Sequence, residues 1–361
     1  MTEKTMTAEN PQSKIQNSKI AILFHDGIHG KIGKTGLSLL RYSQAEIVAV
    51  IDRQSAGKSL PELTKIPRDI PIVASITEAL AFHPEILVIG IAPSGGALPD
   101  ECFVEIKQAV ASGLSIVNGL HTPLANHPEI KPLLRHPQWV WDVRQEPQGL
   151  TIASGKARTL ACRRVLTVGT DMAIGKMSTS LELNATAQRR GINSKFLATG
   201  QAGLMISGEG IALDAVRVDF AAGAVEKMMM QFGNTHDLLI IEGQGSLLHP
   251  GSTATLPLLR GSQPTDLILV HRAHQTHIRN HPNVLIPPLP VVIKLYEMVA
   301  AAGGVMQPTR VAGIAMNTFH LDEVAAREAS AMVEKETGLP CTDPVRFGVD
   351  LLLDAVIGAK K

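Results

Sequence analysis

Residues 165–179 read VLTVGTDMAIGKMST, and this stretch decides the fold of the second half of the chain. It starts with an apolar strand, Val165–Gly169, and leads into a helix that we predict from Lys176 to Arg190. Between them, glycines let the backbone turn tightly, so that its N–H groups converge on a bound phosphate. The helix dipole and the charge of Lys176 strengthen the attraction for an anion. The sequence therefore predicts a phosphate-binding loop, or P-loop, over Gly169–Lys176.

The loop departs from the common P-loop pattern at two points. Five residues separate its glycines, and Met177 stands where a magnesium-binding hydroxyl is expected, although Ser178 follows directly. The alternative interpretation is an ordinary strand-to-helix turn with an exposed lysine. The residues that we expect to contact a phosphate or cofactor are Gly169, Thr170, Asp171, Ala173, Ile174, Gly175, Lys176, Met177 and Ser178.

Apolar strands and helical stretches alternate along both halves of the chain, a pattern typical of βαβ units and parallel sheets. The runs LLII and LILV lack polar alternation, as strands buried on both faces should. We therefore predict an α/β protein with an N-terminal Rossmann-like domain and a C-terminal P-loop NTPase-like domain. The predicted strands are Lys19–Phe24, Ile47–Asp52, Ile70–Ala74, Ile86–Ile91, Leu114–Asn118, Val165–Gly169, Lys195–Thr199, Leu238–Glu242, Leu267–His271 and Arg310–Asn317.

Changes in amino-acid composition along the chain predict where the domains begin and end. Residues 1–18 are polar and lack the apolar segment of a secretory signal, so we expect a disordered leader. Residues 121–149 are rich in proline, histidine and tryptophan, and we interpret them as a connector. The Rossmann-like domain with its connector then spans residues 19–150, and the P-loop domain spans residues 151–361.

The overall composition argues against several classes of protein. Lys and Arg number 34 against 33 Asp and Glu, and aromatic residues make up 3%, so a nucleic-acid partner is not expected. Three scattered cysteines argue against a disulfide framework and a structural zinc site. No apolar run is long enough to span a membrane. We expect a cytoplasmic, homo-oligomeric enzyme acting on a small molecule.

A second glycine pattern follows the first predicted strand. Gly27, Gly30 and Gly33, with Asp52 ending the next strand, fit the fingerprint of a dinucleotide-binding turn. Such a pattern alone is weakly specific. We favour contacts with an anion or with coenzyme A, or a purely structural turn, over dinucleotide binding.

Three segments in the second half resemble dethiobiotin synthetase, in the same order along the chain. They are the Gly-Thr-Asp-x-x-x-Gly-Lys loop at Gly169–Lys176, the strand ending in Glu-Gly-x-Gly at Leu239–Gly245, and the strand ending in Asn at Gly313–Asn317. The resemblance implies that Lys176 binds phosphate and that Asn317 contacts the base of a nucleotide cofactor. It also implies that Glu242, with Ser178, holds Mg²⁺ if ATP is the cofactor.

The whole chain resembles a two-domain bacterial and archaeal family long catalogued as uncharacterised, some of whose members are D-glutamate N-acetyltransferases. The shared stretches are Ala198–Gly203, Asp219–Glu226, Glu242–Pro250 and Thr342–Arg346. This resemblance implies acetyl-CoA as a cofactor and an acidic amino acid as the substrate.

Polar side chains near the ends of the predicted strands are candidates for catalysis. Glu242 is a metal ligand, a base or a structural cap, and His249 in a Gly/Pro loop is a general base or a structural histidine. We expect His271 and Arg272 to face substrate carboxylates, because a guanidinium binds a carboxylate through two hydrogen bonds. The catalytic candidates are Glu242, His249 and His271, and the substrate-binding candidates are Arg272, Gln201 and Arg346.

Three further histidines, His274, His277 and His281, are spaced to share one face of a helix, which would suit zinc. Pro282 and the polar residues around it weaken the helix prediction. Metal binding is therefore not our preferred interpretation of this cluster.

Three hypotheses follow. The leading one is an acyl-CoA-dependent N-acyltransferase for a small, D-glutamate-like amino acid, with the P-loop holding the coenzyme phosphates. The second is an ATP- and Mg²⁺-dependent ligase or kinase of the dethiobiotin synthetase type. The third is a nucleotide-binding regulatory protein without turnover.

Overall fold

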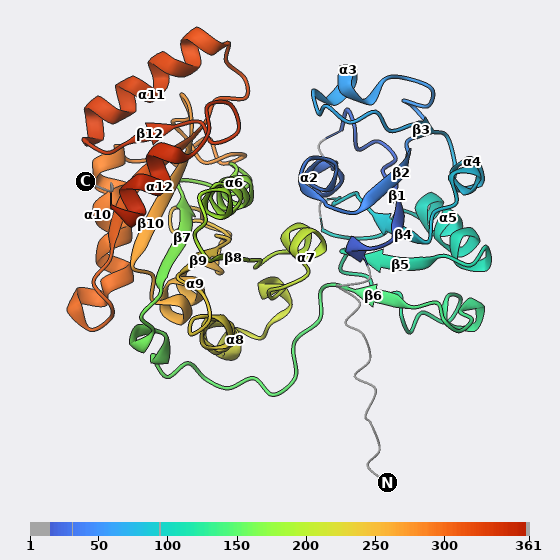
Figure 1. Cartoon of the computed structure of the whole chain (residues 1–361), viewed down its shortest axis with the longest axis horizontal. Helices are drawn as coiled ribbons and strands as arrows, with labels where there is room; N and C mark the ends of the chain where they lie inside the picture. Colours follow the sequence, from blue (N-terminus) through green and yellow to red (C-terminus); the bar gives the residue numbers. More distant parts are fainter. Residues whose placement is uncertain (1–14, 31, 94, 359–361) are drawn as a thin grey trace. The chain divides into compact units, whose positions relative to one another are not determined.

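The computed structural model describes residues 15–30, 32–93 and 95–358 (Figure 1). The chain divides into two compact units, Met1–Gln145 with Gln201–Glu209, and Glu146–Gly200 with Gly210–Lys361. The boundary predicted from sequence lies five residues later, between residues 150 and 151. Most of the predicted leader falls outside the described residues, and within its last four residues Ile15 is buried.

The first unit is built on a six-stranded parallel sheet in the order β3-β2-β1-β4-β5-β6. The strand order reverses between β1 and β4, as in Rossmann folds, and the predicted fold class is confirmed. The strands are β1 (Lys19–Leu23), β2 (Glu46–Ile51), β3 (Ile72–Val73), β4 (Ile86–Ile89), β5 (Ser115–Asn118) and β6 (Val140–Asp142).

The prediction that residues 121–149 form only a connector is wrong, because β6 lies inside this segment and pairs with β5. A three-residue strand at a sheet edge carries no hydrophobic period that sequence reasoning can detect. The helices of the first unit are α2 (Lys34–Tyr42), α3 (Leu60–Thr64), α4 (Ile76–Ala79), α5 (Asp100–Ala111) and α7 (Gln201–Ser207).

The second unit is also a six-stranded parallel sheet, in the order β12-β11-β10-β7-β9-β8. The strand that leads into the predicted P-loop, β7, is central, with β10 on one side and β9 on the other. The strands are β7 (Arg163–Gly169), β8 (Ser194–Leu197), β9 (Leu238–Ile241), β10 (Asp266–Arg272), β11 (Arg310–Asn317) and β12 (Cys341–Thr342).

Both faces of this sheet are covered by helices, so its strands are apolar throughout. Along β9, Leu238 and Ile240 pack in one core cluster, with α6 and α12, whereas Leu239 and Ile241 pack in the other, with α8, α9 and α10. This explains why the run LLII does not alternate with polar residues. The helices are α6 (Lys176–Arg189), α8 (Val218–Phe232), α9 (Thr255–Ser262), α10 (Leu289–Ala301), α11 (Glu323–Thr337) and α12 (Asp350–Ile357).

A fully buried arginine fixes the start of β7. The guanidinium of Arg164 donates to the backbone carbonyls of Leu160, Cys162, Ser262 and Gln263, at 2.8 to 3.1 Å. Burial lowers the pKa of Arg164 below its ordinary value. The four carbonyls disperse the charge, so this arginine holds the strand that carries the P-loop.

Candidate functional site

The P-loop joins β7 to α6 and has the backbone of an anion-binding turn. Ala173 and Gly175 adopt positive φ angles of 55° and 115°. The backbone N–H groups of Ala173, Ile174 and Gly175 make no hydrogen bond with other residues in the described ranges. The first N–H groups of α6 also lack acceptors within the helix, as at every helix start. The loop therefore offers several donors to an anion next to a positive helix end.

Lys176 is the first residue of α6, and its side chain is buried against the loop. Its Nζ donates to the carbonyl of Asp171 at 2.7 Å. A Cβ added at Gly169 would lie 3.1 Å from Nζ, and one added at Gly243, after β9, would lie 3.0 Å from Cδ of the same lysine. Both glycines thus leave space for the side chain that brings positive charge to the loop.

Asp171 ties the P-loop to the segment that follows β10. Its Oδ2 accepts hydrogen bonds from Gln275 Nε2 at 2.5 Å and from the backbone N–H of Arg279 at 2.7 Å. Its Oδ1 accepts from the backbone N–H of Met172 at 2.6 Å. The carboxylate thus connects the P-loop to this segment, and the expected contact of Asp171 with a phosphate or cofactor stays a prediction.

Glu242 follows β9 and is buried at the carboxyl edge of the sheet. Its Oε2 accepts from the backbone N–H groups of Thr199 and Gly200, at 3.0 and 3.2 Å, and its Oε1 accepts from Gln244 Nε2 at 3.1 Å. Oε2 thus joins the end of β9 to the residues that follow β8, while Oε1 contacts the loop that follows Glu242 itself. These contacts support the structural alternative considered for Glu242, and the roles predicted for Glu242 and Ser178 in holding Mg²⁺ stay predictions.

His271 is buried at the end of β10, and its Nδ1 lies 2.9 Å from Thr170 Oγ1 in the P-loop. Burial, together with the nearby His274, lowers the pKa of His271 to about 4. The imidazole is therefore neutral near pH 7. Its contact with Thr170 makes it a positioning group for the loop.

His249 lies in the loop after β9, and its ring is 5.0 Å from that of His281, edge to face. Its Nδ1 accepts from the backbone N–H of Gly251 at 3.0 Å. In the neutral form the proton must then sit on Nε2, which makes this nitrogen a donor. The geometry suits donation to an oxyanion better than the predicted role of general base.

A pocket of about 400 Å³ opens beside the P-loop, between the segments that follow β10 and β11. Asn317 forms part of its wall and donates from Nδ2 to the P-loop carbonyl of Ile174 at 2.9 Å. Arg272 also lies in this wall, next to the P-loop. The lining residues are Arg272, Ala273, His274, Gln275, His277, Arg279, Asn317, Phe319 and His320.

The two remaining predicted substrate residues both make hydrogen bonds with protein groups. Gln201 belongs to the first unit, where it accepts from Arg144 Nε at 2.6 Å and donates to Thr35 Oγ1 at 3.2 Å. Arg346 donates to the backbone carbonyls of Leu321, at 2.9 Å, and Thr318, at 3.4 Å. These contacts hold both side chains in place, and substrate binding by either residue stays a prediction.

The histidine cluster does not lie on a helix. His274 and Asn280 have positive φ angles, and His277 forms an isolated β-bridge with Leu285, so the segment is a folded loop. Within the described ranges, no group of three or more His, Cys, Asp or Glu side chains is arranged to hold a metal ion.

The glycine pattern of the first unit is explained by close packing. A Cβ at Gly30 would lie 2.0 Å from the carbonyl oxygen of Asp26, and one at Gly33 would lie 1.9 Å from that of Gly27. Asp52 accepts from the backbone N–H of Asp26 at 3.2 Å. The turn is thus folded on itself, which supports its structural interpretation.

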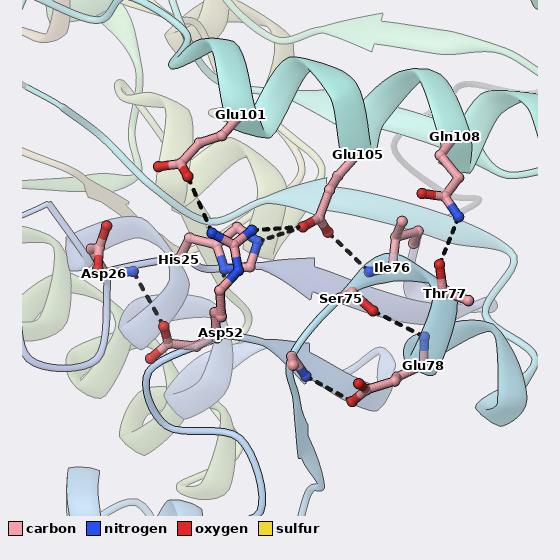
Figure 2. A network of polar contacts seen from close by, with 12 residues as sticks. His25, Asp26, Asp52, Ser75, Ile76, Thr77, Glu78, Glu101, Glu105 and Gln108 are labelled. Atoms are coloured by element: carbon pink, nitrogen blue, oxygen red, sulfur yellow. Dashed lines mark hydrogen bonds and ion pairs between the residues drawn. The ribbon is translucent and has the colours of Figure 1, made fainter.

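Figure 2 shows a network of polar contacts around His25 and Glu105, two buried residues of the first unit. His25 Nε2 lies 2.8 Å from Glu105 Oε1, while His25 Nδ1 accepts from the backbone N–H of Arg53 at 3.2 Å. Glu105 also accepts from the backbone N–H of Ile76, at the start of α4, at 2.9 Å. The network connects β1, α4 and α5 and leaves the ring nitrogens of His25 fully used.

Sequence reasoning missed Tyr296, Gln275 and Arg279. The buried hydroxyl of Tyr296 donates to the carbonyl of Gly169 at 2.7 Å and accepts from the backbone N–H of Leu247 at 3.1 Å. A single tyrosine on an apolar helix carries no motif. Gln275 and Arg279 lie within the segment that contains the histidines. Apart from being polar or charged, they belong to no sequence pattern that predicts a role in the site.

Within the described ranges, no helix combines the length and the apolar character needed to cross a membrane. A family model described as the P-loop domain of DUF1611, a domain of unknown function, matches residues 151–353. A second model, the Rossmann-like domain DUF1611_N, matches residues 53–146.

Two relatives are named D-glutamate N-acetyltransferase. The one from a Pseudoalteromonas species is 38% identical over 77% of this chain and 83% of its own length. The one from Tritonibacter scottomollicae is 38% identical over 78% of this chain and 84% of its own length. The crystal structure of a DUF1611 family protein from Anabaena variabilis is 66% identical, with a TM-score of 0.93 over 94% of this chain and 99% of that protein. The chain therefore belongs to the DUF1611 family, with its Rossmann-like N-terminal domain and its P-loop C-terminal domain.

Proposed function

We propose that the protein is an acyl-CoA-dependent N-acyltransferase that acetylates a small acidic amino acid of the D-glutamate type. The observation that carries this proposal is the 38% identity, over about three quarters of the chain, to two proteins named D-glutamate N-acetyltransferase. The geometry of the P-loop supports it, because a phosphate-bearing cofactor is what that loop is built to bind.

In this proposal the P-loop binds the pyrophosphate of coenzyme A. The free N–H groups of Ala173, Ile174 and Gly175 and the start of α6 provide the hydrogen bonds. Lys176 adds the compensating charge. His271 acts indirectly, by fixing Thr170 within the loop.

The chemistry is the transfer of an acetyl group from sulfur to nitrogen. The substrate ammonium group first gives up one proton to water. The neutral amine nitrogen then attacks the thioester carbonyl carbon, a C–N bond forms, and the negative charge moves to the carbonyl oxygen. The C–S bond then breaks, and the thiolate takes up the proton that the amine releases. Nε2–H of His249 is the donor that we propose for the oxyanion, and the Glu242 carboxylate makes this edge of the sheet attractive to the substrate ammonium group.

The second hypothesis, an ATP- and Mg²⁺-dependent ligase or kinase, shares the P-loop but fits the remaining residues less well. Met177 takes the place of the usual magnesium-binding hydroxyl, and both oxygens of Glu242 are used by protein donors. Formation of ADP with any amino or carboxylic acid, dependent on Mg²⁺, would favour this second function.

A thiol-release assay tests the proposal. With acetyl-CoA we expect rapid release of the thiol with D-glutamate and slow release with D-glutamine, which lacks the second carboxylate.

Lys176→Ala should lower kcat/KM at least tenfold, because a charge-assisted contact to phosphate is lost. Lys335→Ala, an exposed lysine on α11, is the matched control and should behave like the wild type. No thiol release with any acidic amino acid would defeat the proposal, and tight binding of coenzyme A without turnover would point to a regulatory protein.

A further inference from the structure

The pocket beside the P-loop has a basic lining. Two arginines, Arg272 and Arg279, and three histidines, His274, His277 and His320, contribute to its wall. No aspartate or glutamate side chain is found among the described residues that line it. Such a lining is complementary to a ligand group that carries several negative charges.

Two buried polar atoms in the pocket wall lack a hydrogen-bond partner among the described residues. They are Nε of Arg272, a donor, and Oε1 of Gln275, an acceptor. Leaving buried polar atoms unpaired is unfavourable, and most such atoms in folded proteins have a partner. Each atom therefore keeps a hydrogen-bonding capacity that the described residues do not use.

The pocket shares its wall with the P-loop. Asn317 contacts the carbonyl of Ile174, and the segment with Gln275 and Arg279 is attached to Asp171. A ligand whose phosphates occupy the P-loop must therefore place here a group that is close to those phosphates along its own covalent structure.

Coenzyme A has one such group. Its 3′-phosphate is separated from the pyrophosphate only by the ribose ring, whereas the thioester lies at the far end of the long pantetheine arm. The lining of the pocket, with Arg272 and Arg279 and no carboxylate among its described residues, suits this phosphate.

We propose, as an extension of the proposed function, that this pocket binds the 3′-phosphorylated adenosine end of coenzyme A. Arg272 and Arg279 face the 3′-phosphate, and the ring of Phe319, whose residue is 84% exposed, provides a surface for the adenine. This moves Arg272 from the substrate carboxylates to the coenzyme. It also makes the pocket the feature that distinguishes coenzyme A from ATP, which has a 3′-hydroxyl group.

Acetyl-CoA and acetyl-dephospho-CoA, which lacks only the 3′-phosphate, provide the test. For the wild type we expect KM to be at least tenfold lower for acetyl-CoA, since charge-assisted contacts to phosphate are lost with the analogue. In Arg279→Ala, KM for acetyl-CoA should rise towards the value for the analogue, and KM for the analogue should rise less. Arg260→Ala, an exposed arginine on α9, is the control of equal charge and should retain the preference.

Calorimetric titration with coenzyme A and dephospho-coenzyme A separates this proposal from the proposed function. Preferential binding of coenzyme A that is lost in Arg279→Ala supports the pocket assignment even if no acetyl transfer is found, in which case only the proposed activity fails. Equal KM values for the two donors in the wild type, or an equal rise for both in Arg279→Ala, overturn the pocket assignment and leave the acetyltransferase proposal intact. No binding of coenzyme A overturns both.

Discussion

Glu105 shows how a single buried carboxylate is kept ionised. Burial alone would raise its pKa, but hydrogen bonds from His25 and from the backbone N–H of Ile76, with the charge of Arg53 nearby, lower the pKa below its ordinary value. A carboxylate whose pKa is lower in the folded state stabilises the fold above its unfolded pKa, about 4.3 for Glu. This contribution is lost as the pH falls through the lower, folded pKa.

Glu105→Gln should therefore reduce the free energy of unfolding most at neutral pH. Because a charged hydrogen-bond partner of His25 is replaced by a neutral one in a buried place, we expect a loss of about 1–3 kcal/mol. Urea denaturation between about pH 7 and pH 3 measures it, and the difference from the wild type should shrink at the acidic end. Glu129→Gln, at an exposed ion pair on the same unit, is the control. A difference that grows on acidification would contradict this account.

Elements differed in how well the sequence predicted them. β7, β9 and β10 were predicted because a sheet covered on both faces needs uninterrupted apolar runs, and α6 was predicted from its glycine-rich start. The short elements β6 and α7 were missed, since they are set by tertiary packing and show no hydrophobic periodicity.

In the site, the P-loop and its lysine were predicted from the motif. The pocket, in contrast, depends on contacts between loops, such as that of Asp171 with Arg279, which a local sequence pattern cannot predict.

The start of β7 depends on Arg164, and its replacement tests how firmly the element is held. Arg164→Met keeps an elongated side chain but leaves four buried carbonyls without their donor, so we expect a loss of about 3–5 kcal/mol in the free energy of unfolding. Chemical denaturation gives the value, with exposed Arg158→Met as the control. A loss below about 1 kcal/mol would mean that water replaces the guanidinium at little cost.

On the scale of the whole molecule, the two units differ in their readiness to bind a cofactor. The glycine turn of the first unit is closed by its own packing, while the P-loop of the second keeps free N–H groups. The domain boundaries, the homo-oligomeric state and the cytoplasmic location stay predictions.

The rise in Tm that a bound ligand causes measures, in the intact chain, which of the two units binds a cofactor. Coenzyme A at a hundred times its Kd should stabilise the native state by about 2.7 kcal/mol and raise Tm by a few degrees, whereas NAD should leave Tm unchanged. Differential scanning fluorimetry measures both shifts. At the same concentration, the stabilisation by coenzyme A should fall to about 1.4 kcal/mol or less in Lys176→Ala, for binding at least tenfold weaker, and should be unchanged in Lys335→Ala. A clear rise in Tm with NAD would contradict the structural interpretation of the glycine turn in the first unit.

The hydroxyl of Tyr296 serves two neighbours at once, the carbonyl of Gly169 and the backbone N–H of Leu247. The same oxygen atom thus joins the end of β7 to the segment that leads to His249. If coenzyme A binds the P-loop as we propose, a shift of Gly169 would reach His249 through Tyr296, a side chain that is not among the proposed ligand contacts.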